Sequence, residues 1–342
     1  MSVKEKTYRV VKWLVRNLAL TLLTAFVFLL GLELAYRYYW FDFYNTEITL
    51  LNEQVKNKKS STTILVLGDS FTAGENSYVS ILNDSLPDVR VINAAVPGFG
   101  IEEISTIAET RIDEFQPDAI ILQLYAGNDL LDVQKPVNWS TVSFARNCYW
   151  SIANNFYSVR YLNYKLGQYK SGTSFSSEST DIKSLSEFSV ATFSEREKML
   201  IAADPGYLDK SINLSGGYET RYITFKKRLD EIVALCRERK IKLTLLVLPA
   251  SCQVAPFYLG NAQQVGAQFA NPVIGDTVYP LYTQLETDLA KDSVTLINPL
   301  GRFREMDSED HRLFYANDIH LNAYGQLVLA KILLNRIAVL KS

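Results

Sequence analysis

"VLGDSFTAG", residues 66–74, is the stretch from which the fold of this chain can first be predicted. It continues an apolar run that begins at Thr62, and such a run is typical of a parallel strand buried on both faces. The run ends abruptly at Gly68, Asp69 and Ser70, and small residues follow. A serine held at the end of a buried strand is a candidate nucleophile, provided that another part of the chain supplies a base.

Similar apolar runs recur further along the chain. They cover residues 89–98, 117–129, 241–250 and 293–299. Amphipathic helical patterns lie between them, as at 100–115 and 218–240, and a last helix is expected to begin at Asn322, a favourable N-cap residue. Buried strands that alternate with helices predict an α/β fold, a three-layer α/β/α sandwich around a five-stranded parallel sheet.

The alternation lapses in residues 130–216, which hold aromatic stretches and then a serine-rich polar segment. We expect an insertion here between the third and fourth strands, part helical and part mobile loop. Two roles stay open for it at this point. Either the insertion covers the active site and sets specificity, or it is a surface segment without a role in the reaction.

The N-terminal part has the pattern of a membrane anchor. Residues 1–17 carry five basic side chains and one acidic one, and residues 18–36 carry a single charge, Glu33. Nineteen helical residues span about 29 Å, close to the thickness of a bilayer core. Basic residues before the span predict a cytoplasmic N-terminus, so Glu33 and the aromatic cluster from Tyr36 to Phe43 are expected near the opposite interface. A cleaved signal peptide is the alternative, although the apolar run is long for one and no A-x-A-like site follows.

This pattern divides the chain into a cytoplasmic segment (1–17), a transmembrane helix (18–36), a tether (37–62) and a domain (63–342) on the periplasmic or outer side. The formal net charge is −2, which gives no electrostatic footprint for nucleic acid. The three cysteines permit one disulfide but do not require it, and they lack metal-site spacing.

The chain contains only two histidines, His311 and His320. Asp318 stands two residues before His320 in an apparent loop, so its carboxylate can hold the imidazole in the tautomer that accepts a proton from Ser70. His311 lies in the polar segment "SEDHRLF" and is expected at the surface.

Candidate oxyanion donors follow three of the predicted strands. The N–H of Ser70 is expected at the start of a helix, Gly98 allows a close backbone approach, and Asn128 offers a side-chain amide. Asp129 either orients Asn128 or caps a turn.

These four blocks, G-D-S-F, I-N-A-A-V-P-G, A-G-N-D and D-I-H-L-N, resemble those of the SGNH (GDSL-type) hydrolases, with Phe71 in place of the usual leucine. The resemblance covers roughly 63–342, with 130–216 outside it. It implies a flavodoxin-like fold, chemistry at ester bonds without a cofactor or metal, Ser70 as nucleophile, Asp318 and His320 as acid and base, and Gly98 and Asn128 as oxyanion donors.

The sequence therefore predicts a membrane-anchored serine esterase acting on O-acyl or acetyl esters of a carbohydrate or lipid. An O-acetyltransferase that modifies an exported polysaccharide shares the same triad and is the alternative. A catalytically silent scaffold of an envelope assembly is a third reading, which the intact motif residues disfavour. Envelope or polysaccharide-assembly proteins are the expected partners.

Overall fold

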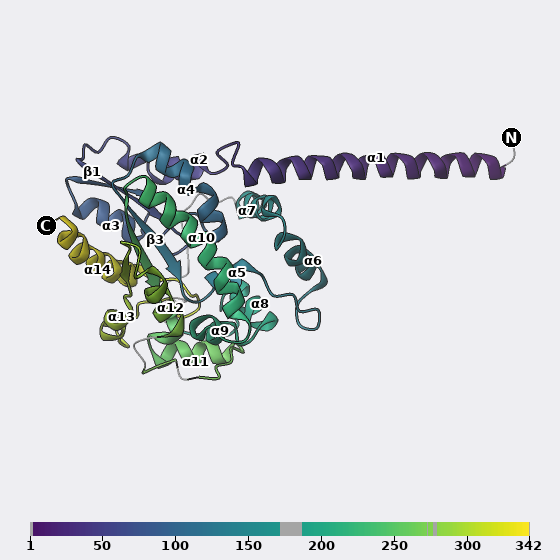
Figure 1. Ribbon diagram of the computed structural model, residues 1–342. Coiled ribbons are helices and arrows are strands. Elements are labelled where there is room, and N and C mark those ends of the chain that lie inside the picture. Colours follow the sequence, from purple (N-terminus) through teal and green to yellow (C-terminus); the bar gives the residue numbers. More distant parts are fainter. Residues whose placement is uncertain (1–2, 172–186, 272, 276–278, 342) are drawn as a thin grey trace.

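A computed structural model describes residues 3–171, 187–271, 273–275 and 279–341 (Figure 1). Its strands are β1 (Thr62–Leu67), β2 (Val89–Asn93), β3 (Ala119–Tyr125), β4 (Lys242–Leu248) and β5 (Thr295–Ile297). They form one sheet in the order β2-β1-β3-β4-β5, and every neighbouring pair is parallel. The prediction of a five-stranded parallel sheet is confirmed.

The apolar runs are strands because both faces of the sheet are covered. In β1, which has a neighbouring strand on each side, the side chains from Ile64 to Leu67 are all at most 5% exposed. The order of the sheet places β2 and β3 on either side of β1. The carboxyl ends of these three strands therefore lie next to one another along one edge.

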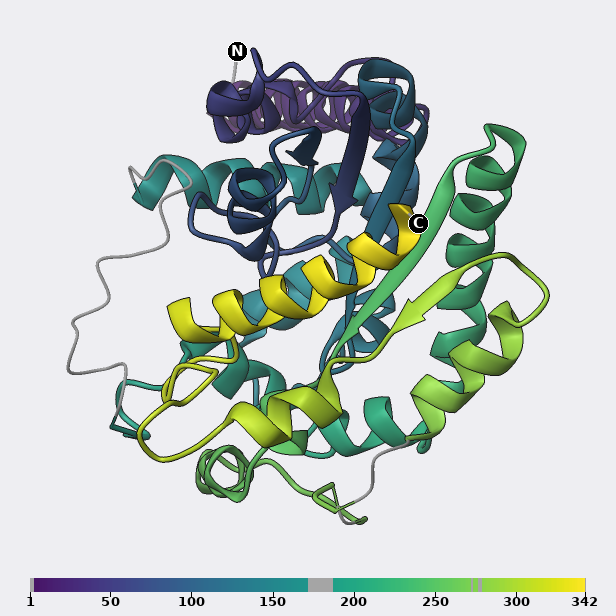
Figure 2. The ribbon, with the colours of Figure 1, turned by 90° about the vertical axis from the view of Figure 1, so that its left-hand side faces the viewer.

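Helices cover both faces of the sheet (Figure 2). α4 (Ile101–Phe115) packs beside α10 (Tyr218–Glu238) in one layer, and α3 (Tyr78–Ser85) packs beside α14 (Ala323–Lys341) in the other. The side chain of Asn322 accepts a hydrogen bond from the backbone N–H of Gly325 at 3.0 Å, so Asn322 caps α14 as expected. Further helices, α11 (Pro256–Gln264), α12 (Pro280–Leu289) and α13 (Leu300–Met306), complete the C-terminal half.

The region expected to be an insertion is largely helical where it is described. Its helices are α5 (Asp129–Val133), α6 (Phe144–Ala153), α7 (Tyr157–Ser171), α8 (Glu195–Ala203) and α9 (Tyr207–Asn213). The expected mobile loop falls mainly on residues 172–186, which lie outside the described residues.

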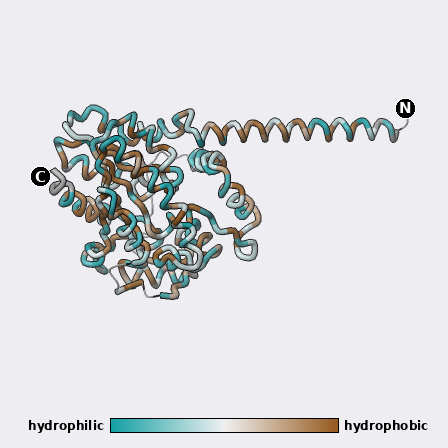
Figure 3. The backbone as a smooth tube through the Cα atoms, viewed as in Figure 1, coloured by the Kyte–Doolittle hydropathy of each residue, from teal (hydrophilic) through white to brown (hydrophobic). Residues whose placement is uncertain are grey.

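The N-terminal helix α1 (Val3–Arg37) projects away from the rest of the chain (Figure 1). Within Thr7–Arg37, an 18-residue stretch has a mean hydropathy of 2.2 and only 11% of it is buried, so by length and composition this helix can cross a membrane. Figure 3 shows the apolar residues concentrated toward the domain and the polar ones toward the N-terminus. The basic segment is helical too, because neither glycine nor proline interrupts it.

The last turn of α1 differs from the expectation, because it is part of the folded domain. Glu33 is 3% exposed, and its carboxylate accepts hydrogen bonds from Ser158 N (2.9 Å), Ser158 Oγ (2.6 Å) and Tyr157 N (3.2 Å). These amides open α7, where free N–H groups and the helix dipole favour an anion. Tyr36 is also buried, whereas Trp40 and its exposed aromatic neighbours remain free for an interface.

The segment expected as a tether is folded as well. It contains α2 (Asn45–Leu51) and a short 3-10 helix, η1 (Glu53–Val55). The side chain of Asn52 donates to the carbonyl of Asn93 at 2.7 Å and accepts from its N–H at 2.9 Å. Asn52 therefore pairs the N–H and the carbonyl of Asn93 on the outer edge of β2. Such pairing protects an edge strand from pairing with another chain.

Candidate active site

Ser70 lies in a tight turn directly after β1. The backbone N–H groups of Thr72 and Ala73 both donate to the carbonyl of Asp69, at 3.2 and 2.9 Å. The expectation that a helix begins at Ser70 is wrong, because α3 begins only at Tyr78, beyond Gly74 with its φ of +125°. Ser70 is therefore presented by a single turn rather than by a helix N-terminus.

Gln123 of β3 holds this turn from the neighbouring strand. It is 1% exposed, and its Oε1 accepts hydrogen bonds from Asp69 N (3.1 Å) and Thr72 Oγ1 (2.9 Å). A Cβ at Gly68 would lie 2.5 Å from the same oxygen, so glycine leaves the space that this contact needs. Sequence reasoning missed Gln123, although a lone polar residue inside an apolar strand was an available signal.

A loop near the C-terminus brings the histidine to the serine. Ser70 Oγ and His320 Nε2 are 2.7 Å apart although 250 residues separate them in the sequence. His320 Nδ1 is hydrogen-bonded to Asp318 Oδ1, which also accepts from the backbone N–H of His320 at 3.0 Å. A β-bridge between Phe314 and Leu321 closes this loop.

The aspartate and the histidine stabilise each other's charged forms. Burial opposes ionisation of Asp318, but the hydrogen bonds and charge of His320 lower the pKa of that carboxyl below its usual value. Burial likewise disfavours the imidazolium, yet the hydrogen bond and charge of Asp318 raise the pKa of His320 above 6.5, with further contributions from Asp69 and Glu197. The two side chains are each one third exposed, so the site is open to a ligand.

Gly98 and Asn128 follow the strands that flank β1. Gly98 has a φ of +80°, and the nearest atom to an added Cβ would be Arg196 Nη1 at 3.7 Å. Asn128 precedes the first residue of α5 and is 7% exposed, and its Oδ1 has no hydrogen-bond partner in the described part of the chain. Asp129 Oδ2 accepts a hydrogen bond from Tyr125 N at 2.9 Å, so this carboxylate stabilises the turn that contains Asn128.

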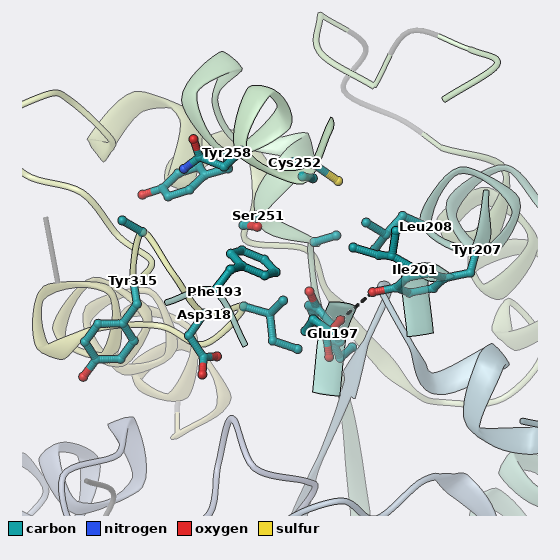
Figure 4. A pocket seen from close by; sticks show the side chains of 16 residues that line it. Phe193, Glu197, Ile201, Tyr207, Leu208, Ser251, Cys252, Tyr258, Tyr315 and Asp318 are labelled. Carbon is teal, nitrogen blue, oxygen red and sulfur yellow. Dashed lines mark hydrogen bonds between the residues drawn. The ribbon is translucent and has the colours of Figure 1, made fainter. Parts of the chain in front are cut away.

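A small cavity adjoins the loop that carries Asp318 (Figure 4). Its volume is about 20 Å³, room for about one water molecule, and Asp318 and Glu197 line it. Glu197 comes from α8, is 2% exposed, and accepts a hydrogen bond from Tyr207 Oη at 2.6 Å. Sequence reasoning missed this buried carboxylate, since its contacts exist only after the inserted helices pack on the sheet.

The other histidine and the cysteines take no part in the hydrogen bonds that join Ser70, His320 and Asp318. His311 is exposed, as expected, and its ring lies near that of Tyr324. All three cysteines are free, and burial raises the pKa of Cys252 to about 12, so its thiol stays protonated. The described residues contain no group of three or more His, Cys, Asp or Glu that could hold a metal ion.

No protein-family model and no curated protein matches this sequence. Solved structures are similar at low identity. TesA is 14% identical with a TM-score of 0.38, and the match covers 79% of this chain and 94% of that one. The acetyl xylan esterase AlAXEase is 13% identical with a TM-score of 0.40 and coverages of 80% and 99%. Esterase EstA from Pseudoalteromonas sp. is 12% identical with a TM-score of 0.37 and coverages of 81% and 97%.

The strand order defines the class of fold. The sheet is parallel with the order β2-β1-β3-β4-β5, and the four motif blocks lie at its carboxyl edge and on the loop that carries Asp318 and His320. This is a flavodoxin-like three-layer α/β fold, as the sequence predicts.

Proposed function

We propose that this protein is a serine esterase with Ser70 as its nucleophile. The observation that carries the proposal is the continuous hydrogen-bonded chain from Ser70 Oγ through His320 to Asp318, with 2.7 Å between the serine oxygen and the imidazole. A serine hydroxyl becomes nucleophilic when a neighbouring base takes its proton. Here His320 is the base, and Asp318 is the group that orients it.

In the first half of the reaction, Ser70 Oγ attacks the ester carbonyl while His320 Nε2 takes the hydroxyl proton. The negative charge that develops on the carbonyl oxygen is stabilised by the N–H groups of Ser70 and Gly98 and by the side-chain amide of Asn128. The intermediate collapses, and the leaving alcohol takes the proton from His320. Water then attacks the acyl-enzyme with His320 as base, which releases the acid and restores Ser70.

The proposal includes a permanent anchor. Glu33 and Tyr36 lie in the last turns of α1 and are buried against the domain, so cleavage of α1 would remove partners of Ser158 and its neighbours. The basic residues at the start of α1 favour a cytoplasmic N-terminus and a periplasmic or extracellular domain. A reporter fused after Ser342 should then be active only outside the cytoplasm.

A fluorophosphonate probe tests the nucleophile. We expect it to label the wild-type protein and to leave Ser70→Ala unlabelled. Labelling that persists in this variant would remove Ser70 from the mechanism, and a wild-type protein without labelling or ester turnover would favour the silent scaffold.

The two histidines form a matched pair for the base. With p-nitrophenyl acetate as substrate, His320→Ala should lose most of the turnover, while His311→Ala should stay near the wild type because its exposed ring lies outside the site. The reverse result would overturn the assignment of the base.

An O-acetyltransferase for an exported polysaccharide is the second candidate, because a cavity adjoins Gly98 and offers space for a second substrate. Partition of the acyl group in the presence of glycan oligomers separates the two reactions. Acylated sugar among the products would favour the transferase, and free acid alone would favour the esterase.

A further inference from the structure

A cavity of about 250 Å³ opens beside Gly98. Its walls come from the end of α1, the start of α4 and the inserted helices α6, α7 and α8. Figure 1 shows α7 beside the end of α1 that meets the domain, and α6 next to α7. The mechanism proposed above uses none of the side chains in these walls.

Aromatic rings form much of the lining. Trp150 and Tyr149 come from α6, and Tyr161 and Tyr164 come from α7. Trp150 is 4% exposed, while the three tyrosines are partly exposed. Flat apolar faces with a few polar groups are typical of sites that bind small organic molecules, including sugar rings.

The cavity also carries an excess of positive charge. Two of its four cationic side chains are paired, Lys135 with Asp132 and Arg160 with Glu103, the latter at 2.7 Å. The remaining two, Arg146 and Arg196, have no ion pair or side-chain hydrogen bond within the described residues. The guanidinium of Arg146 lies over the ring of Tyr149, 5.6 Å from its centroid.

The positive charges also act on a neighbouring group, Lys135. Burial lowers the pKa of Lys135 well below its usual value, and the charges of Arg196 and Arg160 lower it further. Like charges gathered in a partly closed cavity repel one another unless an anion joins them. Arginine in particular matches the two oxygens of a carboxylate or phosphate.

The cavity borders the reaction centre. Arg196 Nη1 lies 3.7 Å from the position that a Cβ of Gly98 would take. The charge of Arg196 also acts on Asp69, the residue next to the candidate nucleophile. A molecule in this cavity would therefore contact both the guanidinium of Arg196 and the backbone of an oxyanion donor.

We propose that this cavity binds an anionic sugar unit, a carboxylate-bearing residue of an oligosaccharide or polysaccharide. Its ring stacks on the aromatic side chains, and its carboxylate pairs with Arg146 and Arg196. The binding site stands on the cavity alone. That the bound sugar belongs to the ester substrate or to an acyl acceptor rests on the proposed function.

The test uses the full chain with Ser70→Ala, held in phosphatidylcholine nanodiscs, and calorimetric titration with three probes. Trigalacturonate supplies the anionic sugar, xylotriose a neutral one, and glycerol phosphate the headgroup chemistry of a lipid. We expect trigalacturonate to bind at least about tenfold more tightly than either other probe, and less tightly as salt is raised.

Arginine variants locate the binding. Arg146→Gln and Arg196→Gln should each weaken trigalacturonate binding by about tenfold, and the lysine replacements should retain part of it. Lys198→Gln is the control for Arg196→Gln, since it removes the same charge from the same helix outside the cavity and should leave the affinity unchanged. Unfolding midpoints verify that each variant is folded.

The proposal fails if xylotriose binds as tightly as trigalacturonate, if both arginine variants bind normally, or if glycerol phosphate is preferred, which would indicate a lipid headgroup. Turnover of p-nitrophenyl acetate by the wild-type chain tests the proposed esterase activity independently of sugar binding. Arginine-dependent trigalacturonate binding without any turnover would leave the binding site standing and remove the esterase.

Discussion

Replacement of Gln123 by leucine tests how the sheet holds the nucleophile. Leucine has a similar size but cannot accept the hydrogen bonds from Asp69 N (3.1 Å) and Thr72 Oγ1 (2.9 Å). The Thr72 hydroxyl keeps a partner in Tyr78 Oη at 2.8 Å. The variant therefore leaves the buried N–H of Asp69 without an acceptor.

The expected loss of stability follows from that one group. A buried donor left without a partner costs about 1–3 kcal/mol, so we expect the free energy of unfolding to fall by ~2 kcal/mol. In a domain of this size such a loss lowers the unfolding midpoint by about 4 °C. The released turn also carries Ser70, and a shift of the nucleophile by ~1 Å lowers kcat by about 100-fold.

Gln253→Leu is the matched control. Gln253 is also buried, and its Oε1 accepts a hydrogen bond from Ala250 N at 2.9 Å, just after β4, whose end carries none of the proposed reacting groups. Calorimetry and p-nitrophenyl acetate kinetics should show similar losses of stability in the two variants but a fall in kcat only for Gln123→Leu. Equal kcat values in the two variants would refute the positioning role of Gln123.

Three further predictions concern the base, the oxyanion donor and the anchor. Activity should rise with pH as His320 loses its proton, with the midpoint above 6.5 because Asp318 raises the pKa of His320. Asp318→Asn should shift the pH profile of kcat/KM to lower pH and should lower kcat by about 10⁴. Asn128→Ala should lower kcat for p-nitrophenyl acetate by about 10²–10³, and a normal kcat would remove the amide from the oxyanion site. Glu33→Ala leaves two donors of Ser158 without an acceptor, so the free energy of unfolding should fall by ~3 kcal/mol. The backbone amides at the start of α7 should also exchange hydrogen with solvent faster. Unchanged hydrogen exchange would show that α1 is not docked there.

Much of the fold was predictable because a strand buried on both faces must be apolar throughout. Each of the five apolar runs contains one of the strands, and Asn322 caps the last helix as its side chain predicts. Motif residues at strand ends could also be located, because parallel strands carry their carboxyl ends to one edge.

The expectations that differed from the structure concern packing between distant segments. The composition of α1 predicts a membrane span, yet it does not reveal that the carboxylate of Glu33 accepts hydrogen bonds from Ser158, 125 residues away. The "GDSF" block predicts a serine at a strand end, but the turn that carries it depends on Gln123 of another strand.

By itself, the sequence determined the α/β class, the apolar N-terminal helix and the identity of the candidate reacting residues, since these depend on local periodicity and on residue type. Only the tertiary structure decided that Ser70 and His320 lie within hydrogen-bonding distance, that the last turn of α1 belongs to the domain, and that Arg146 and Arg196 line one cavity. The physical reason is that distances, burial and charge pairing arise between segments far apart in the chain, and a linear pattern does not record which of them meet.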